Sequence, residues 1–315
     1  MSKWPALAVF ALALLLIPQW IQNGYMLGVL TFAMLAAINV IGLNLLMGFA
    51  GQVSMGVAGF YGLGAYTTGV ATVHWGVSPW MGISLAVLIC GGLSYLIGRP
   101  TLRLKGHSLA MATLGIGIVL FIFFMETIPL TGGPDGLSGI PPLSIGDFAF
   151  ESDLTHYWLG AGALWLVVLL SLNLTGSLYG YGMRALGLSE AGSRSIAIDT
   201  HQIKVGIFAL SGAFSGLSGA LYAHIVTFVS PETFDFHASI VFLTMAVFGG
   251  LGSIWGSMAG ALLFSFLPEF LVVFQDYDIL VYGAVLLATV IFLPKGLGGL
   301  ARVVTLKITS MKPKS

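Results

Sequence analysis

The chain has 315 residues, of which 57% are hydrophobic and 8% are charged, and its formal net charge is zero. A water-soluble domain carries about 25% charged residues, so this composition excludes an ordinary soluble fold. The long apolar stretches also differ from the short alternating segments of a β-barrel. We therefore expect an all-α polytopic membrane protein.

The first part of the chain, from Trp4 to Gly98, holds no Lys, Arg, Asp or Glu. A membrane-spanning helix needs about 20 apolar residues. The apolar runs predict four such helices, at residues 4–22, 25–47, 57–75 and 80–98. Four crossings place Lys3 and the basic connection 99–105 on the same side, and basic connections mark the cytoplasmic side of membrane proteins.

The middle of the chain alternates between acidic and basic connections. A fifth predicted span, 107–125, leads to segment 126–156, which holds five acids and no base. A sixth span, 157–174, returns the chain to segment 176–204, and a seventh, 205–229, leaves it again. We therefore assign 126–156 to the external side and 176–204 to the cytoplasmic side.

The stretch 238–267 is too short for two full crossings. Its helix would measure about 45 Å, whereas two crossings need about 60 Å. The turn sequence Gly249–Ser253 divides it, so we expect two short helices that either re-enter or span the membrane. A final span is predicted at 279–293. The total is eight full spans plus this short pair, eight to ten spans in a single domain over residues 1–315.

Few residues in this sequence could carry chemistry. It has no P-loop motif, no His-Glu-x-x-His motif and no Cys/His cluster, so we expect no catalytic residue, metal site or cofactor in this chain. Every Asp and Glu lies at or near the end of a predicted span. This disfavours a proton-coupled transporter, which needs ionisable residues inside the membrane. The energy for moving a solute would then come from a separate ATPase.

Glycine-rich stretches interrupt two of the apolar regions. Small residues let helices approach closely, which is the structural interpretation, while broken helices beside a translocation pathway are the functional one. The candidate pathway residues are Asn44, Gln52, Ser54, Gly56, Gly249, Gly250 and Gly252.

Segment 176–204 is the only basic connection that also holds acids, Glu190 and Asp199. Ser189 followed by Glu190 is the pattern of a helix N-cap with an acid in the first turn. We expect a short amphipathic helix along the membrane surface. It would be either an ordinary interfacial helix or a contact for a partner protein.

Glu190–Ala191–Gly192 resembles the start of the coupling loop of ABC importer permeases, whose short helix docks into a cleft of the cytoplasmic ATPase. This chain has Ala197 where the family usually has glycine. The resemblance implies ATPase-coupling roles for Arg184, Ser189, Glu190, Ala191, Gly192, Arg194, Ala197 and Asp199.

Further stretches resemble, more specifically, the LivM-type permeases of branched-chain amino acid ABC importers. They are residues 42–56, 60–66, 130–137, 248–253 and 294–297. The stretch 130–137 lies in the acidic segment. Its Thr131, Gly132, Gly133, Asp135 and Gly136 would form either a structural turn or a rigid docking element for a solute-binding protein.

The resemblance implies the ABC importer permease fold and a pathway for leucine, isoleucine or valine. The implied partners are a homologous LivH-type permease, two cytoplasmic ATPases that would bind ATP and Mg, a periplasmic or lipid-anchored solute-binding protein, and membrane lipid, without nucleic acid. The implied location is the bacterial inner membrane, with both termini cytoplasmic. The alternatives are a urea or short-amide permease of the same superfamily, a stand-alone secondary transporter or channel, and a membrane enzyme, for which no catalytic constellation is recognisable.

Overall fold

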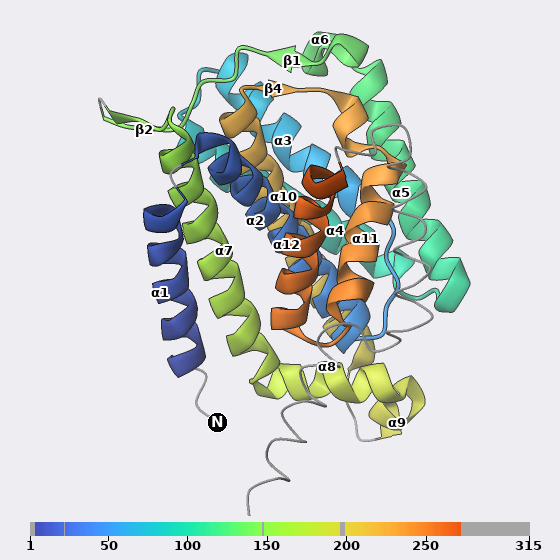
Figure 1. The fold of residues 1–315 in the computed structure, drawn as a ribbon. Helices are drawn as coiled ribbons and strands as arrows, with labels where there is room; N and C mark the ends of the chain where they lie inside the picture. Colours follow the sequence, from blue (N-terminus) through green and yellow to red (C-terminus); the bar gives the residue numbers. More distant parts are fainter. Residues whose placement is uncertain (1–3, 22, 147, 196–198, 272–315) are drawn as a thin grey trace, which may run out of the picture.

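The computed structural model describes residues 4–21, 23–146, 148–195 and 199–271, and within these ranges it is mostly helical (Figure 1). Five of the described helices are long and apolar enough to cross a membrane. They are α2 (Gly24–Asn44) with the π-helix η1 (Leu45–Phe49) that continues it, α4 (Pro79–Thr101), α5 (Gly106–Glu126), α7 (Asp153–Thr175) and α10 (Thr200–Val226). The chain is thus a multi-pass membrane protein.

Shorter apolar helices complete the bundle. They are α1 (Trp4–Trp20), α3 (Val57–Val73), α11 (Phe236–Gly249) and α12 (Ile254–Leu271). Helices α1 to α5 agree with the predicted spans to within a few residues, and α7 contains the predicted sixth span. The predicted span 279–293, the stretch 294–297, Lys3 and Ala197 lie outside the described residues.

The start of α10 differs from the prediction. The predicted seventh span begins at residue 205, whereas the helix begins at Thr200. The cause is Asp199, whose side chain accepts a hydrogen bond of 3.0 Å from the backbone N–H of Gln202 and so caps the helix. Lys204, expected in the connection, therefore lies inside the helix.

Helix α10 packs along α2, α3 and α4, and α2 packs in turn against α7 and α12. Small residues make these contacts close. A Cβ on Gly219 of α10 would lie 1.9 Å from the carbonyl oxygen of Tyr61 in α3, and one on Gly216 would lie 2.7 Å from the Cβ of Cys90 in α4. Only glycine lets these backbones approach so closely.

Helices α11 and α12 form the predicted helical hairpin. The turn between them contains Gly250 and Gly252, with φ angles of 106° and 81°, which favour glycine. From their residue numbers, α11 is about 21 Å long and α12 about 27 Å. The second helix is thus close to the thickness of a bilayer core, about 30 Å.

The connections gather at two opposite ends of the bundle (Figure 1). One end holds α6 (Ile128–Thr131), the 3₁₀ helices η2 (Gly133–Asp135) and η3 (Pro231–Phe234), and four short strands, β1 (Leu137–Ser138), β2 (Ser144–Ile145), β3 (Phe148–Ala149) and β4 (Phe228–Val229). Strand β1 pairs antiparallel with β4, and β2 with β3. The other end holds α8 (Leu178–Leu188) and α9 (Glu190–Ser195). The acidic segment 126–156 and the mixed segment 176–204 therefore lie at opposite ends.

Candidate functional site

Segment 176–204 forms two short helices, α8 and α9, where the sequence analysis expected one. Ser189 joins them, and its side-chain oxygen accepts a hydrogen bond of 3.1 Å from the backbone N–H of Gly192, which makes it the predicted cap. The preceding helix, α8, was not predicted. Its signal was Ser177, whose side chain accepts from Gly180 N–H at 3.3 Å and caps α8 in the same way.

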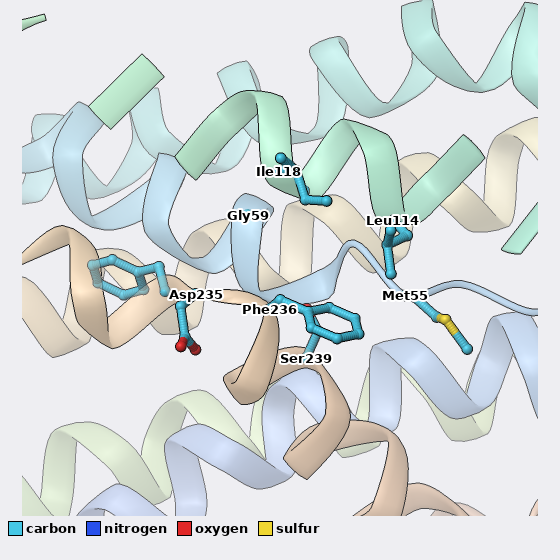
Figure 2. A pocket seen from close by; sticks show the side chains of 9 residues that line it. Met55, Gly59, Leu114, Ile118, Asp235, Phe236 and Ser239 are labelled. Atoms are coloured by element: carbon cyan, nitrogen blue, oxygen red, sulfur yellow. The ribbon is translucent and has the colours of Figure 1, made fainter. Parts of the chain in front are cut away.

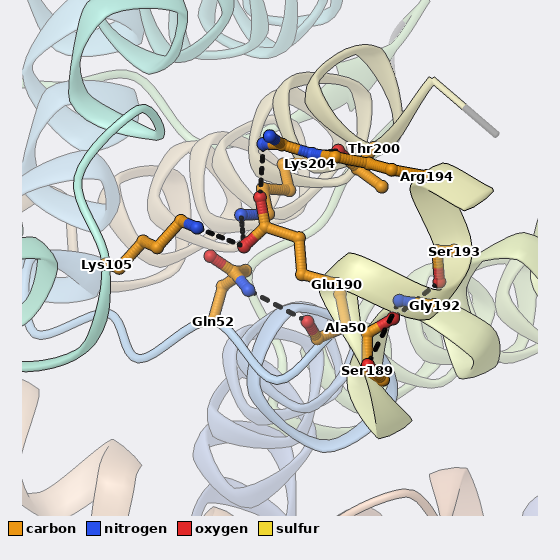
Figure 3. Close-up of polar contacts among 10 residues, drawn as sticks. All are labelled: Ala50, Gln52, Lys105, Ser189, Glu190, Gly192, Ser193, Arg194, Thr200 and Lys204. Atoms are coloured by element: carbon orange, nitrogen blue, oxygen red, sulfur yellow. Dashed lines mark hydrogen bonds and ion pairs between the residues drawn. The ribbon is translucent and has the colours of Figure 1, made fainter. Parts of the chain in front are cut away.

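Glu190 is the centre of an ion-pair cluster (Figure 3). Its carboxylate lies 2.6 Å from Arg194, 3.0 Å from Lys204 and 3.6 Å from Lys105. Arg194 belongs to α9, Lys204 to α10, and Lys105 to the connection between α4 and α5. The cluster thus ties the six-residue helix α9 to two other parts of the bundle.

The charges in this cluster depend on one another. Partial burial raises the pKa of Glu190, but the hydrogen bond from Lys204 and the positive charges of Lys204, Lys105 and Arg194 outweigh it, so the pKa falls below 4.5. The side chain of Lys204 is only 2% exposed. Burying an ammonium group without a partner is costly, and the ion pair with Glu190 supplies that partner.

The other predicted coupling residues divide into those that hold the segment together and those that face outward. Arg184 donates a hydrogen bond of 3.1 Å to the carbonyl of Thr175, and Asp199 caps α10. Ala191 and Gly192 are exposed, and Leu188 beside them is 90% exposed. We call Leu188, Ala191 and Gly192 the coupling face. Leu188 was missed by the sequence analysis, since exposure of an apolar residue in a short helix leaves no local pattern.

Among the predicted pathway residues, Asn44 makes the most contacts. It is 1% exposed at the end of α2. Its amide nitrogen donates to the carbonyls of Gly250 at 3.2 Å and Ser253 at 3.0 Å and to the hydroxyl of Ser257, and its oxygen accepts from Gly252 N–H at 2.8 Å. This one side chain therefore holds the turn of the α11–α12 hairpin against α2.

The remaining predicted pathway residues do not join this site. A Cβ on Gly249 would lie 2.2 Å from the carbonyl oxygen of Gly256, and one on Gly56 would lie 2.4 Å from that of Thr113, so both glycines permit close helix packing. Gln52 donates to the carbonyl of Ala50 at 3.0 Å in the connection after η1, and Ser54 is buried in the same connection. Of the seven predicted pathway residues, the structure thus brings together Asn44, Gly250 and Gly252.

The π-helix η1 lies between the hairpin turn and α8. It begins directly after Asn44, and its last residue, Phe49, contacts α8: a Cβ on Gly187 would lie 2.6 Å from the Phe49 carbonyl oxygen. π-Helical turns are rare and frequent at functional sites. A continuous set of contacts therefore leads from α8 through η1 and Asn44 to the hairpin.

A small cavity of about 10 Å³ lies between α3, α5 and the start of α11. Met55, Leu114 and Phe236 provide apolar walls, and Asp235 and Ser239 are the polar groups (Figure 2). Asp235 caps α11 by accepting from Ala238 N–H at 3.0 Å. Such a volume holds about one water molecule, so the cavity in this conformation has no room for a larger molecule.

The stretch 130–137 forms a tight turn at the opposite end. Thr131 donates to the carbonyl of Phe124 at 2.7 Å, and Gly132, Gly133 and Gly136 have φ angles of 78°, 60° and 75°. Asp135, between them, is exposed. Four of the five predicted residues thus hold the backbone of the turn, and Asp135 is left facing outward.

Within the described ranges, no group of three His, Cys, Asp or Glu side chains is placed to hold a metal ion. His224 is buried and lies 2.8 Å from both the Thr68 hydroxyl and the Pro141 carbonyl. These contacts join α10 to α3 and to the connection before α7, so His224 holds these elements together.

Comparison with known proteins gives a consistent result. Residues 25–290 match the family described as the permease component of branched-chain amino acid transport systems. The chain is 32% identical to the high-affinity branched-chain amino acid transport system permease protein LivM of Salmonella typhimurium, over 92% of this chain and 74% of that protein. It is 25% identical to the corresponding protein LivH of Escherichia coli, over 89% of this chain and 95% of that protein. It is 26% identical to the autoinducer 2 import system permease protein LsrC of Yersinia enterocolitica, over 76% of this chain and 67% of that protein. No solved structure matches the chain.

Proposed function

Because this chain belongs to the family of permease components of branched-chain amino acid transport systems, we propose that it forms part of the membrane pathway of an ATP-driven importer for leucine, isoleucine and valine. The observation that carries the proposal is the similarity to LivM over 92% of the chain. The family match, residues 25–290, includes the Glu190 cluster, the Asn44 contacts and the turn at 130–137.

The ATPase contact is assigned to α8 and α9. The exposed coupling face, Leu188, Ala191 and Gly192, offers a small apolar surface that could enter a cleft on a partner. A displacement of α9 would act on α10 through the Glu190–Lys204 pair and on the α4–α5 connection through Lys105. Two ATPase subunits that close on binding ATP and Mg would supply the displacement.

The α11–α12 hairpin is assigned to the gate of the pathway. Movement of α8 would reach it through the Gly187–Phe49 contact and then through Asn44. The cavity near Asp235, about 10 Å³, supports the need for such a movement, since no amino acid fits there.

The remaining partners follow from the family. A second, LivH-type permease would complete the pathway, and a solute-binding protein would dock near Asp135 at the acidic end. This end would face the periplasm and the basic end the cytoplasm of a bacterium, with the chain in the inner membrane and both termini cytoplasmic. The chain itself would carry no catalytic residue, since ATP hydrolysis would occur on the partner ATPases.

The proposal is tested by co-purification and uptake. A tagged chain expressed with the other subunits of its importer should retain the ATPase subunits. Glu190→Lys places a fourth positive charge where three converge, so it should reduce both ATPase retention and leucine uptake by about ten-fold or more. Asp199→Asn is the matched control, because asparagine caps a helix as well as aspartate does.

Two outcomes would contradict the proposal. Leucine uptake by the wild-type chain without any bound ATPase would indicate a stand-alone transporter. Uptake of urea or short amides in place of leucine would keep the importer mechanism and replace the substrate.

A further inference from the structure

A cationic groove lies between the last turns of α4 and the first turn of α10. It has a volume of about 540 Å³, and its walls include Tyr95, Arg99, Arg103, Asp199 and His201. A smaller hollow of about 180 Å³ shares Arg103 and His201 with it and extends to Lys204. The groove therefore opens beside the Glu190 cluster at the basic end of the molecule.

The groove has an excess of positive charge. Among the described residues, no carboxylate lies within ion-pair distance of Arg99 or Arg103. Asp199, the acid in the groove wall, uses its carboxylate to accept the Gln202 backbone N–H. Glu190, which lines the smaller hollow, is shared among Lys105, Arg194 and Lys204. Two guanidinium groups and one carboxylate thus line the groove, and no carboxylate of the described residues forms an ion pair with either guanidinium.

One of these guanidinium groups is already held in place. Arg99 donates a hydrogen bond of 2.8 Å to the hydroxyl of Tyr95, one turn earlier in α4, and lies 4.7 Å from the centre of that ring. An oriented guanidinium binds phosphate oxygens with two parallel hydrogen bonds, a geometry that lysine does not offer.

An exposed apolar face continues from the groove along α4. Leu88 is 72% exposed and Tyr95 is 40% exposed. Positions 88, 95 and 99 recur at helical spacing, so they share one face with Arg99 at its end. A ligand that fits both features carries a negative charge at one end and a long apolar chain behind it.

We propose that this groove binds the phosphate head group of an anionic phospholipid from the cytoplasmic leaflet. Arg99 and Arg103 bind the phosphate, and an acyl chain lies along the face of α4 that bears Leu88 and Tyr95. Basic pockets between spanning helices at the cytoplasmic side are suited to such head groups. The proposal requires the basic end to face the cytoplasm and is independent of which solute is transported.

Native mass spectrometry of the purified full-length chain, delipidated in detergent, tests the proposal. Phosphatidylglycerol, phosphatidylcholine and inorganic phosphate are the three probes. The wild-type chain should retain phosphatidylglycerol in preference to phosphatidylcholine. Arg103→Gln should weaken phosphatidylglycerol binding by about ten-fold, the value of one charge-assisted hydrogen bond.

Arg184→Gln is the matched control, because it removes one arginine charge from the same end without touching the groove. It should leave phosphatidylglycerol binding unchanged. Equal losses in both variants, or no preference between the two lipids, would overturn the proposal. Competition by inorganic phosphate as effective as that by the lipid would replace it with a free-anion site. Displacement of the lipid when the ATPase subunits bind would assign the groove to them instead.

Discussion

Glu190 connects three parts of the chain that the sequence separates. Its partners are Lys105, Arg194 and Lys204, and only Arg194 is a local neighbour, four residues away. The sequence showed that acids and bases mix in segment 176–204, because charge is visible without a structure. It did not show that Lys105 belongs to the same cluster, since that contact depends on how α4, α5 and α10 pack.

The lowered pKa of Glu190 predicts how the stability of the protein depends on pH. A carboxyl whose folded-state pKa lies below its ordinary value of 4.5 stabilises the fold fully above that pH, and the contribution is lost as the pH falls through the folded-state pKa. At pH 6–7, Glu190→Gln should therefore lower the free energy of unfolding by about 1–3 kcal/mol relative to the wild type. The variant should then unfold at a lower temperature.

Thermal unfolding in detergent between about pH 3 and pH 7 measures this difference. The two proteins should become alike as the pH falls below the ordinary value of 4.5. A gap that stays constant down to pH 3 would mean that the ionised carboxylate is not the source of the stability.

The turn at 130–137 contains a glycine that its backbone requires, Gly136, and an exposed side chain, Asp135. Gly136 has a φ of 75°, and a Cβ there would lie 2.5 Å from the carbonyl oxygen of Val229. Gly136→Ala should therefore cost at least about 1–2 kcal/mol and lower the unfolding temperature.

Asp135→Asn should leave that temperature unchanged and weaken binding of the solute-binding protein, measured by titration. If Asp135→Asn left binding intact, Asp135 would not belong to the docking surface.

At the scale of elements, the helices were predictable and their contacts were not. Apolar runs and turn residues located α1 to α5, α7 and the α11–α12 hairpin, because these signals are local. The sequence analysis missed α8, a short helix with three glycines among its 11 residues, which lower its helix propensity, and it placed the start of α10 too late because the apolar run begins only after Lys204. Of the seven proposed pathway residues, three lie together in the structure. Asn44 reaches the hairpin turn through hydrogen bonds that depend on how α2 packs against the hairpin, and the sequence does not show that packing.

Asn44→Ala should uncouple the hairpin from α2. The change removes the donor to Gly250 and Ser253 and the acceptor for Gly252 N–H, and each buried polar group left without a partner costs about 1–3 kcal/mol. We expect a lower unfolding temperature and a loss of solute uptake with the ATPase subunits still bound. Ser84→Ala is the control, because that exposed hydroxyl bonds only within its own helix. Normal uptake by Asn44→Ala would show that the hairpin is not the gate.

At the scale of the whole molecule, the acidic and basic ends predict which side of the membrane each faces. In intact cells, an impermeant thiol reagent should label Asp135→Cys and not Ala191→Cys. Both positions are exposed, and the natural Cys90 is 0% exposed, so background labelling should be low. Permeabilising the cells with detergent should allow the reagent to label Ala191→Cys. Labelling of Ala191→Cys alone in intact cells would reverse the topology.

The importer function itself is tested most directly by leucine uptake into proteoliposomes that contain this chain, its partner permease and the ATPase subunits, with the solute-binding protein added outside. We predict uptake that requires ATP and the binding protein. Glu190→Lys should reduce this uptake by about ten-fold or more, and Asp199→Asn should preserve it. Uptake that proceeds at the same rate without ATP, or that Glu190→Lys leaves unchanged, would contradict the function proposed for this chain.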